Sequence, residues 1–333
     1  MRKGSLVAAP AMLLLLLGLA GAAQGRPAAA PASLTVLGFQ SEPSPARLID
    51  RSAKAMDVVG VDGVDLAGPG KVSAPDHWAL RQLARAKANG LQGVFLVDNW
   101  SNSSNGFSER LAHQTLGNPS AVGAVARSLA SDVQTEGWNG VSLDLEALRA
   151  RDSGGLDALV SDLHANLPPG SSLTVCLSAA TSLAAYKAMG YDLQTLAANA
   201  TQLILMTYDD HGPWERTPGP IGPLRWQRAS LATLEKVVPV TEIYLGSADY
   251  AYAWRPHHRY GLSVNQARQT ARAWHAQPHW IGSAGEWRAR QDHSTLWWSD
   301  ARSLRVRLRM AERLGVYGVA IWSLGSGDPI PQA

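Results

Sequence analysis

The chain has 333 residues, of which 46% are hydrophobic, and its formal net charge is +3 at pH 7. This apolar content is enough for a sizeable core, and the small net charge without a lysine or arginine run argues against binding to nucleic acid or to a membrane surface. The single cysteine, Cys176, excludes an internal disulfide, and its Val/Leu-rich surroundings predict a buried position in a strand.

The first residues have the pattern of a secretory signal peptide. Arg2 and Lys3 give the positive start, residues 7–19 the apolar segment and residues 20–23 a small-residue cleavage site. A membrane anchor is the alternative, but the apolar run is short for a spanning helix and Pro10 interrupts it. We therefore predict a signal peptide over residues 1–23 and a disordered Ala/Pro-rich leader over 24–32. The mature protein would be secreted or periplasmic, with no integral membrane segment.

From Ser33 onward, apolar strand patterns alternate with amphipathic helical patterns, which is typical of a parallel α/β fold. The predicted strands are 34–39, 57–61, 93–97, 139–146, 172–178, 202–208, 241–245 and 317–322. The predicted helices are 46–55, 77–88, 119–136, 156–167, 183–200 with a break at Gly190, 231–236 and 302–314. Eight strands over roughly 300 residues predict a single (β/α)8 TIM barrel in residues 33–333.

One connection in this pattern is unusually long. Residues 246–299 separate the seventh strand from the last helix, which is far more than a strand-to-helix loop needs. The segment is rich in Trp, His, Tyr and Arg, and the whole chain has twelve tryptophans against three phenylalanines. Because indole rings are flat platforms for sugar rings, this composition suits a carbohydrate-binding surface.

The predicted strand 139–146 contains the strongest candidates for catalytic residues. Its sequence, Asn-Gly-Val-Ser-Leu-Asp-Leu-Glu, alternates apolar and polar side chains, which therefore point to opposite sides. In a closed barrel the polar side is the interior, so Asp144 and Glu146 would lie at the carboxyl end of a strand, where barrel enzymes place their catalytic groups. Two carboxylates about 7 Å apart repel each other, which raises the pKa of one and suits a general acid. A salt-bridged strand end explains this pattern equally well.

Three motifs resemble those of glycoside hydrolase family 18, in the family's order. Residues 140–146 resemble the strand-4 signature D-G-x-D-x-D-x-E, although Asn139 and Ser142 replace its first two Asp residues. The sequence Leu-Met-Thr-Tyr-Asp-Asp-His-Gly at 205–212 resembles the strand-6 motif M-T-Y-D-x-H-G. The sequence Gly-Val-Ala-Ile-Trp-Ser-Leu-Gly at 318–325 resembles the end of strand 8 with its tryptophan.

Three further stretches resemble one branch of that family, the spore-cortex-lytic N-acetylglucosaminidases. They are residues 96–99, the Y-x-Y-x-W pattern at 250–254 and Trp-Trp-Ser-Asp at 297–300. The resemblance thus covers nearly the whole predicted mature chain. It implies a small α+β insertion, residues 255–299, between strand 7 and the last helix, and this insertion would form one wall of the substrate groove.

The resemblance also implies roles for individual side chains. Glu146 would donate a proton to the glycosidic oxygen, while Asp144 and Tyr208 would hold the N-acetyl group of the substrate. Asp209 would contact the sugar or order its loop, and Trp322 would be the floor under the sugar at the cleavage point. Each of these side chains also has a purely structural alternative, as a barrel-lining or core residue. The groove candidates, by position only and equally compatible with packing, are Asn99, Trp100, Tyr250, Tyr252 and Trp254.

The replacements in the strand-4 motif bear on mechanism. Ser142 cannot take up charge as the second Asp of many chitinases does, although its hydroxyl could still bond Asp144, so we expect altered rate and pH optimum rather than another reaction. An aspartate nucleophile needs carboxyl groups roughly 5 Å apart across the sugar, whereas Asp144 lies below Glu146 on one strand. The resemblance implies instead that the substrate's 2-acetamido oxygen attacks, with an oxazolinium intermediate and retention of configuration. No metal or organic cofactor is implied.

These interpretations predict a secreted, monomeric glycoside hydrolase acting on β-linked N-acetylglucosamine polymers, with peptidoglycan favoured over chitin and no nucleic-acid partner. A carbohydrate-binding barrel that has lost catalysis is one alternative, and the presence of Glu146 argues against it. A polysaccharide deacetylase is another, in which Asp209, Asp210 and His211 would bind a metal. That ligand set is weak, and sensitivity to chelators would separate the two chemistries.

Overall fold

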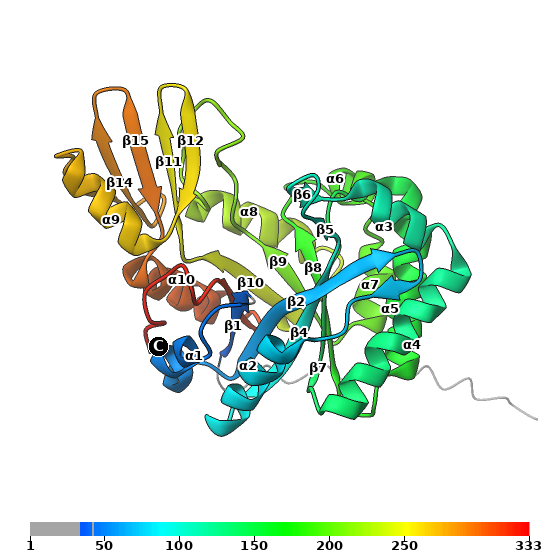
Figure 1. The fold of residues 1–333 in the computed structure, drawn as a ribbon. Coiled ribbons are helices and arrows are strands. Elements are labelled where there is room, and N and C mark those ends of the chain that lie inside the picture. Colours follow the sequence, from blue (N-terminus) through cyan, green and yellow to red (C-terminus); the bar gives the residue numbers. More distant parts are fainter. Residues whose placement is uncertain (1–33, 42, 333) are drawn as a thin grey trace, which may run out of the picture.

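The computed structural model describes residues 34–41 and 43–332, so the predicted signal peptide and leader lie outside the described residues. Eight parallel strands follow one another around a closed barrel (Figure 1), and β1 closes it by pairing with both β2 and β16. The predicted (β/α)8 barrel is therefore confirmed. The barrel strands are β1 Thr35–Ser41, β2 Val58–Gly68, β4 Gln92–Asp98, β7 Gly140–Asp144, β8 Ser172–Ser178, β9 Gln202–Met206, β10 Ile243–Ala248 and β16 Gly318–Trp322.

Helices cover the outside of the barrel. The apolar sides of these helices and the outward side chains of the strands form one large core, which includes Val59, Phe95 and Leu159. A second, smaller core fills the barrel interior around Leu37, Leu96 and Ile204. The covering helices are α1 Arg47–Ser52, α2 His77–Ala88, α3 Glu109–Leu116, α4 Pro119–Glu136, α5 Ser153–Asn166, α6 Leu183–Ala188, α7 Leu193–Asn199, α8 Leu224–Leu234 and α10 Ala301–Leu314. No helix in the described part of the chain is long and apolar enough to cross a membrane.

The structure differs from the sequence prediction mainly in short elements. The segment between β4 and α4, for which no element was predicted, contains the hairpin β5 Trp100–Ser101 and β6 Gly106–Phe107 and then α3, whose first turn is capped by the hydroxyl of Ser108. The predicted helix 183–200 is two helices, because Gly190 adopts a left-handed φ of +81° between them. Helix α8 begins at Leu224, seven residues before the predicted start.

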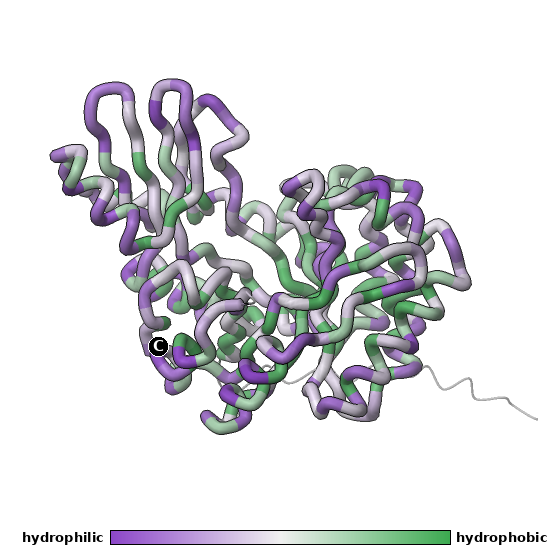
Figure 2. Tube along the Cα trace, in the orientation of Figure 1, coloured by the Kyte–Doolittle hydropathy of each residue, from purple (hydrophilic) through white to green (hydrophobic). Residues whose placement is uncertain are grey.

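A second sheet is inserted between β10 and α10 and projects from the barrel (Figure 1). Its five antiparallel strands lie in the order β12, β11, β15, β14 and β13, and α9 packs on one of its faces. Figure 2 shows that its hairpin tips are hydrophilic, whereas the middle of the barrel is hydrophobic. The inserted elements are β11 Ala251–Arg255, β12 His258–Leu262, α9 Val264–Ala273, β13 Pro278–Ile281, β14 Glu286–Gln291 and β15 Ser294–Trp298.

Candidate active site

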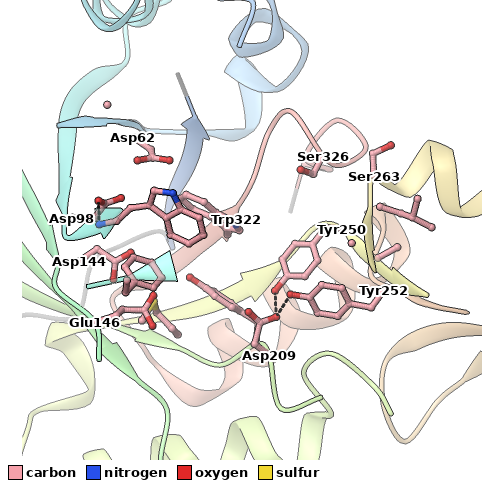
Figure 3. A pocket seen from close by; sticks show the side chains of 18 of the residues that line it. Asp62, Asp98, Asp144, Glu146, Asp209, Tyr250, Tyr252, Ser263, Trp322 and Ser326 are labelled. Atoms are coloured by element: carbon pink, nitrogen blue, oxygen red, sulfur yellow. Dashed lines mark hydrogen bonds between the residues drawn. The ribbon is translucent and has the colours of Figure 1, made fainter. Parts of the chain in front are cut away.

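A cavity of about 700 Å³ opens at the carboxyl end of the barrel, beside the inserted sheet. Because the barrel strands are parallel, the side chains that end them meet there although they are far apart in sequence. Figure 3 shows the carboxylates of β2, β4 and β7 on one side and a group of tyrosines on the other. Eight of the ten predicted site residues line this cavity: Trp100, Asp144, Glu146, Tyr208, Asp209, Tyr250, Tyr252 and Trp322.

The two carboxylates of the central motif lie at and just beyond the end of β7. The strand ends at Asp144, so Glu146 belongs to the segment that follows it. Burial, followed by the negative charges of Asp209 and Asp98, raises the pKa of Glu146 to about 7. Burial and the Glu146 charge raise the pKa of Asp144 well above its ordinary value, and one of its oxygens is buried without a hydrogen-bond partner. Glu146 therefore keeps its proton close to neutral pH, as a general acid must.

Asn99 does not contact the cavity, which corrects its prediction as a groove residue. Its side chain is fully buried and holds the backbone of Glu146 from both sides. The Oδ1 atom accepts from the Glu146 N–H at 2.9 Å, and the Nδ2 group donates to the Glu146 carbonyl at 2.9 Å. Nδ2 also donates to the Ser108 carbonyl at 3.1 Å. Since β7 has already ended, Asn99 takes the place of a neighbouring strand for these two backbone groups.

The tyrosines opposite Glu146 converge on Asp209. The hydroxyls of Tyr250 and Tyr252 both donate to its Oδ1 atom, the second at 2.9 Å. Burial raises the pKa of Asp209 above its ordinary value, and these two hydrogen bonds only partly offset the rise. Asp209 has a φ of +64°, which a non-glycine residue rarely adopts, so the hydrogen bonds hold it in a strained backbone conformation. The ring of Tyr208 packs edge-on against Tyr250, with centroids 6.4 Å apart.

The loop that carries Asp209 is also fixed at its far end. The backbone amides of Ile221 and Gly222 each donate at 2.8 Å to the carboxylate of Glu286, on the inserted sheet. Glu286 pairs at 2.9 Å with Arg307 of α10, and both side chains are almost completely buried. The insertion, the last helix and the loop after β9 are thereby joined behind the tyrosine wall.

The three predicted tryptophans lie in different environments. Trp322 ends β16 and is half-buried in the cavity, 5.8 Å from the ring of Phe39. Trp100 is 37% exposed at the cavity edge. Trp254 does not line the cavity: it is only 3% exposed, and its Nε1 group donates to the Glu215 carbonyl at 3.1 Å. This corrects its prediction as a groove residue. Alternation puts Trp254 on the same strand face as Tyr252 but farther from the barrel, under the loop that contains Glu215.

The two replaced motif residues are built into the barrel. Ser142 is fully buried, and its hydroxyl accepts from the Thr174 hydroxyl at 2.8 Å and lies 3.8 Å from the Cys176 sulfur. The suggested hydrogen bond from Ser142 to Asp144 does not form. The side chain of Asn139, before the start of β7, accepts from the Gly93 amide at 2.9 Å and joins β7 to β4. The prediction of a buried Cys176 is confirmed.

Sequence reasoning missed a second row of carboxylates, Asp62, Asp65 and Asp98, in the same cavity. Burial, followed by the charge of Asp65, raises the pKa of Asp62 to about 6. Burial raises the pKa of Asp98 to about 8, although a hydrogen bond from the Trp100 amide lowers it. The spacing of Asp62 and Asp65 after a predicted strand was the available signal. An exposed tryptophan, Trp214, was also missed; its ring lies 5.8 Å from that of Tyr252.

Asp209, Asp210 and His211, the three residues considered as metal ligands, do not point to a common centre. Asp209 faces the tyrosines, whereas the Nδ1 atom of His211 lies 3.2 Å from Asp210 and 3.2 Å from the carbonyl of Pro220. Within residues 34–41 and 43–332, no group of three or more His, Cys, Asp and Glu side chains could hold a metal ion. The geometry thus gives no support to a metal-dependent deacetylase.

Several known proteins are similar to this chain in sequence or in fold. The Bacillus subtilis (strain 168) protein YdhD, named as a sporulation-specific glycosylase, is 26% identical over 240 residues, which are 68% of this chain but only 56% of YdhD. A chitinase from Chromobacterium violaceum has the same fold, with a TM-score of 0.80 and 23% identity over 89% of this chain and 96% of its own. The spore cortex-lytic enzyme SleL of Bacillus cereus gives a TM-score of 0.78 and 18% identity over 90% of this chain and 72% of its own.

The family assignment rests on a longer match. The model of glycosyl hydrolases family 18 matches residues 67–327, which contain all the predicted site residues. This is well over half of the chain, and the chain therefore belongs to glycosyl hydrolases family 18 and is a glycoside hydrolase.

Proposed function

We propose that this glycoside hydrolase cleaves β-linked N-acetylglucosamine polymers with retention of configuration, using the acetamido group of the substrate as the nucleophile. The observation that carries the proposal is the pair at the end of β7. Glu146 has a pKa of about 7, and Asp144 lies just before it with one buried oxygen that has no partner. A single strand end thus offers a proton donor and a free hydrogen-bond acceptor.

Glu146 acts as the acid in this proposal. It donates its proton to the glycosidic oxygen and so turns the leaving sugar into a neutral alcohol. Its raised pKa supports this role, because a carboxyl with an ordinary pKa would be ionised at neutral pH. Asn99 fixes the backbone of Glu146, so the acid has a defined position relative to the bond that breaks.

Asp144 and Tyr208 orient the nucleophile. The unpartnered oxygen of Asp144 accepts the N–H of the acetamido group, which removes the cost of a buried acceptor without a hydrogen bond. Tyr208 lines the same cavity and contacts the acetamido group from the side of β9. Trp322 packs against the apolar face of the sugar. The acetamido oxygen is then directed at C1, and no protein carboxylate has to attack from the opposite face.

We further propose that the natural polymer is peptidoglycan. Two of the similar proteins are named as a spore cortex-lytic enzyme and a sporulation-specific glycosylase, while another is named as a chitinase. The signal-peptide pattern at the N-terminus supports export of the enzyme to the compartment that contains this polymer.

The test is product analysis after incubation with chitin oligomers and with purified peptidoglycan. We expect new reducing ends on N-acetylglucosamine from both, and more rapid release from peptidoglycan. The control is Glu146→Gln, which keeps the volume of the side chain but has no proton to donate, so activity should fall about a hundred-fold or more while binding persists. Wild-type binding without any cleavage would support a sugar-binding barrel instead.

A further inference from the structure

The inserted sheet is basic, whereas the cavity beside it is acidic. Residues 251–298 contain six arginines and five histidines but only two carboxylates, Glu286 and Asp292. Of these two, Glu286 is buried against Arg307. The described residues that line the cavity include six carboxylates and no lysine, arginine or histidine. The two sides of the groove therefore differ in chemistry: carboxyl groups with raised pKa values line the cavity, and the inserted sheet carries the cations.

Four of these basic residues lie on the sheet face opposite α9. Helix α9 packs on the face that carries Ala253, Leu296 and Trp298. Strand register places two rows of side chains on the opposite face. One row runs Gly261, Tyr252, Trp297, Arg288 and His279, and the other runs Arg259, Trp254, Thr295 and Arg290. We call Arg259, His279, Arg288 and Arg290 the basic face.

The arginines of the basic face are available to a ligand. Arg259 and Arg290 are exposed, and Arg288 is half-buried with its guanidinium 5.7 Å from the ring centre of Trp297. Within the described part of the chain, none of the three has a carboxylate within 4.0 Å. A guanidinium offers two parallel N–H groups that match the two oxygens of a carboxylate. The face therefore suits carboxylates rather than neutral sugars.

The strands of the basic face also reach the cavity. Tyr252 lines the cavity, its register partner Trp297 is buried, and Arg288 is the next residue in the same row. Two strand spacings separate Tyr252 from Arg288, which is about 10 Å. An extended peptide spans about 3.3 Å per residue, so about three residues cover the distance from Tyr252 to Arg288.

We propose that the basic face binds the carboxylates of the peptide side chains of a peptidoglycan strand whose sugars occupy the cavity. This inference rests on the proposed function and names the feature that makes peptidoglycan a better substrate than chitin. The basic face attracts the peptide carboxylates. This attraction orients the strand with its peptides over the inserted sheet. Chitin has no carboxylate and gains nothing from this face.

The test compares the triple variant R259Q/R288Q/R290Q with the wild-type enzyme on two substrates. On soluble peptidoglycan strands that keep their peptides, kcat/KM should fall about ten-fold, because each exposed ion pair contributes a modest amount. On chitin oligomers of the same length, kcat/KM should stay within about two-fold. The loss on peptidoglycan should shrink as salt is added, because the charges are exposed. The double variant R259Q/R290Q leaves Arg288 on Trp297 and keeps the test valid if the triple variant folds poorly.

The matched control is R272Q/R305Q/R309Q, which removes three exposed arginines from α9 and α10 and should leave both substrates unaffected. An equal loss of kcat/KM in this control would mean that the effect comes from the net charge of the protein, and it would overturn the inference. So would a loss that persists on strands stripped of their peptides by an amidase. If wild-type enzyme cleaves both substrates and the triple variant matches it, only this inference fails. If wild-type enzyme cleaves neither, the proposed function itself fails.

Discussion

Asn99 holds Glu146 by two hydrogen bonds of 2.9 Å, one to its N–H and one to its carbonyl, at the point where β7 has ended. The residue that follows, Ala147, has a left-handed φ of +56°. The chain therefore turns sharply directly after the proposed acid, and the side-chain amide of Asn99 fixes this turn. Asn99 is a positioning residue, since it reaches the substrate only through Glu146.

Replacing Asn99 with alanine should lower kcat about ten- to a hundred-fold while KM changes little, because a small displacement of the acid is costly in the transition state. The comparison is steady-state kinetics on chitin oligomers, with thermal unfolding measured in parallel. Asn99→Asp keeps the acceptor for the Glu146 N–H and should recover part of kcat. A loss confined to the melting temperature would make Asn99 a structural residue only.

The pH profile should show the environment of Glu146. The acid works only when protonated, and its pKa is about 7, so kcat/KM should fall as pH rises through about 7. Asp209→Asn removes the negative charge that, after burial, contributes most to this rise, and its amide oxygen can still accept from the Tyr250 and Tyr252 hydroxyls. The pKa of Glu146 should then drop, and the alkaline limb should move to lower pH.

The measurement is kcat/KM between about pH 4 and pH 9. Asp292→Asn, at an exposed hairpin tip, serves as the control and should leave the limb in place. An alkaline limb that does not move in the Asp209→Asn variant would assign this limb to a group other than Glu146.

Two tryptophans of the site region should respond differently to substitution. Trp322→Ala removes the apolar platform in the cavity and should lower kcat/KM about ten-fold or more. Trp254→Phe acts on a buried ring that donates to the Glu215 carbonyl, so it should lower the melting temperature and leave kcat/KM within about two-fold. Kinetics and thermal unfolding of both variants check this contrast. The prediction is wrong if the Trp254→Phe variant loses as much kcat/KM as the Trp322→Ala variant.

The buried pair of Glu286 and Arg307 should be important for stability. Arg307→Met leaves the Glu286 carboxylate without its cation in the interior and should cost about 3–5 kcal/mol of unfolding free energy. Arg85→Met breaks an exposed pair with Asp50 and should change the unfolding free energy far less, because solvent screens exposed charges. Denaturant unfolding of the two variants gives the comparison, and similar costs would mean that burial of the pair is unimportant.

The barrel and its central motif were predictable from sequence because their signals are local. Alternation in 139–146 puts Asp144 and Glu146 on one side, and the predicted strand 172–178 and helices 77–88 and 119–136 agree with β8, α2 and α4. The acidic row was missed although Asp62 and Asp65 follow one predicted strand and Asp98 follows the next, because these carboxylates lack the alternating pattern that marks Asp144 and Glu146. Asn99 was misassigned because a polar residue after a strand suits a groove as well as a backbone clamp.

Trp254 shows a second limit of prediction from local sequence patterns. Alternation correctly predicts that Tyr250, Tyr252 and Trp254 share one face of the chain, but it does not show how far the cavity extends along that face. The loop after Asp209 covers Trp254 through Glu215, and that contact joins residues 39 positions apart in sequence.

The central claim is that the acetamido group of the substrate performs the attack. The most direct measurement compares the release of reducing ends from a fully N-acetylated glucosamine tetramer with that from the same tetramer without acetyl groups. We predict cleavage of the acetylated tetramer and a rate at least about a hundred-fold lower on the other, since Glu146 alone supplies no nucleophile. Comparable rates on the two tetramers would contradict the account and require a nucleophile from the protein.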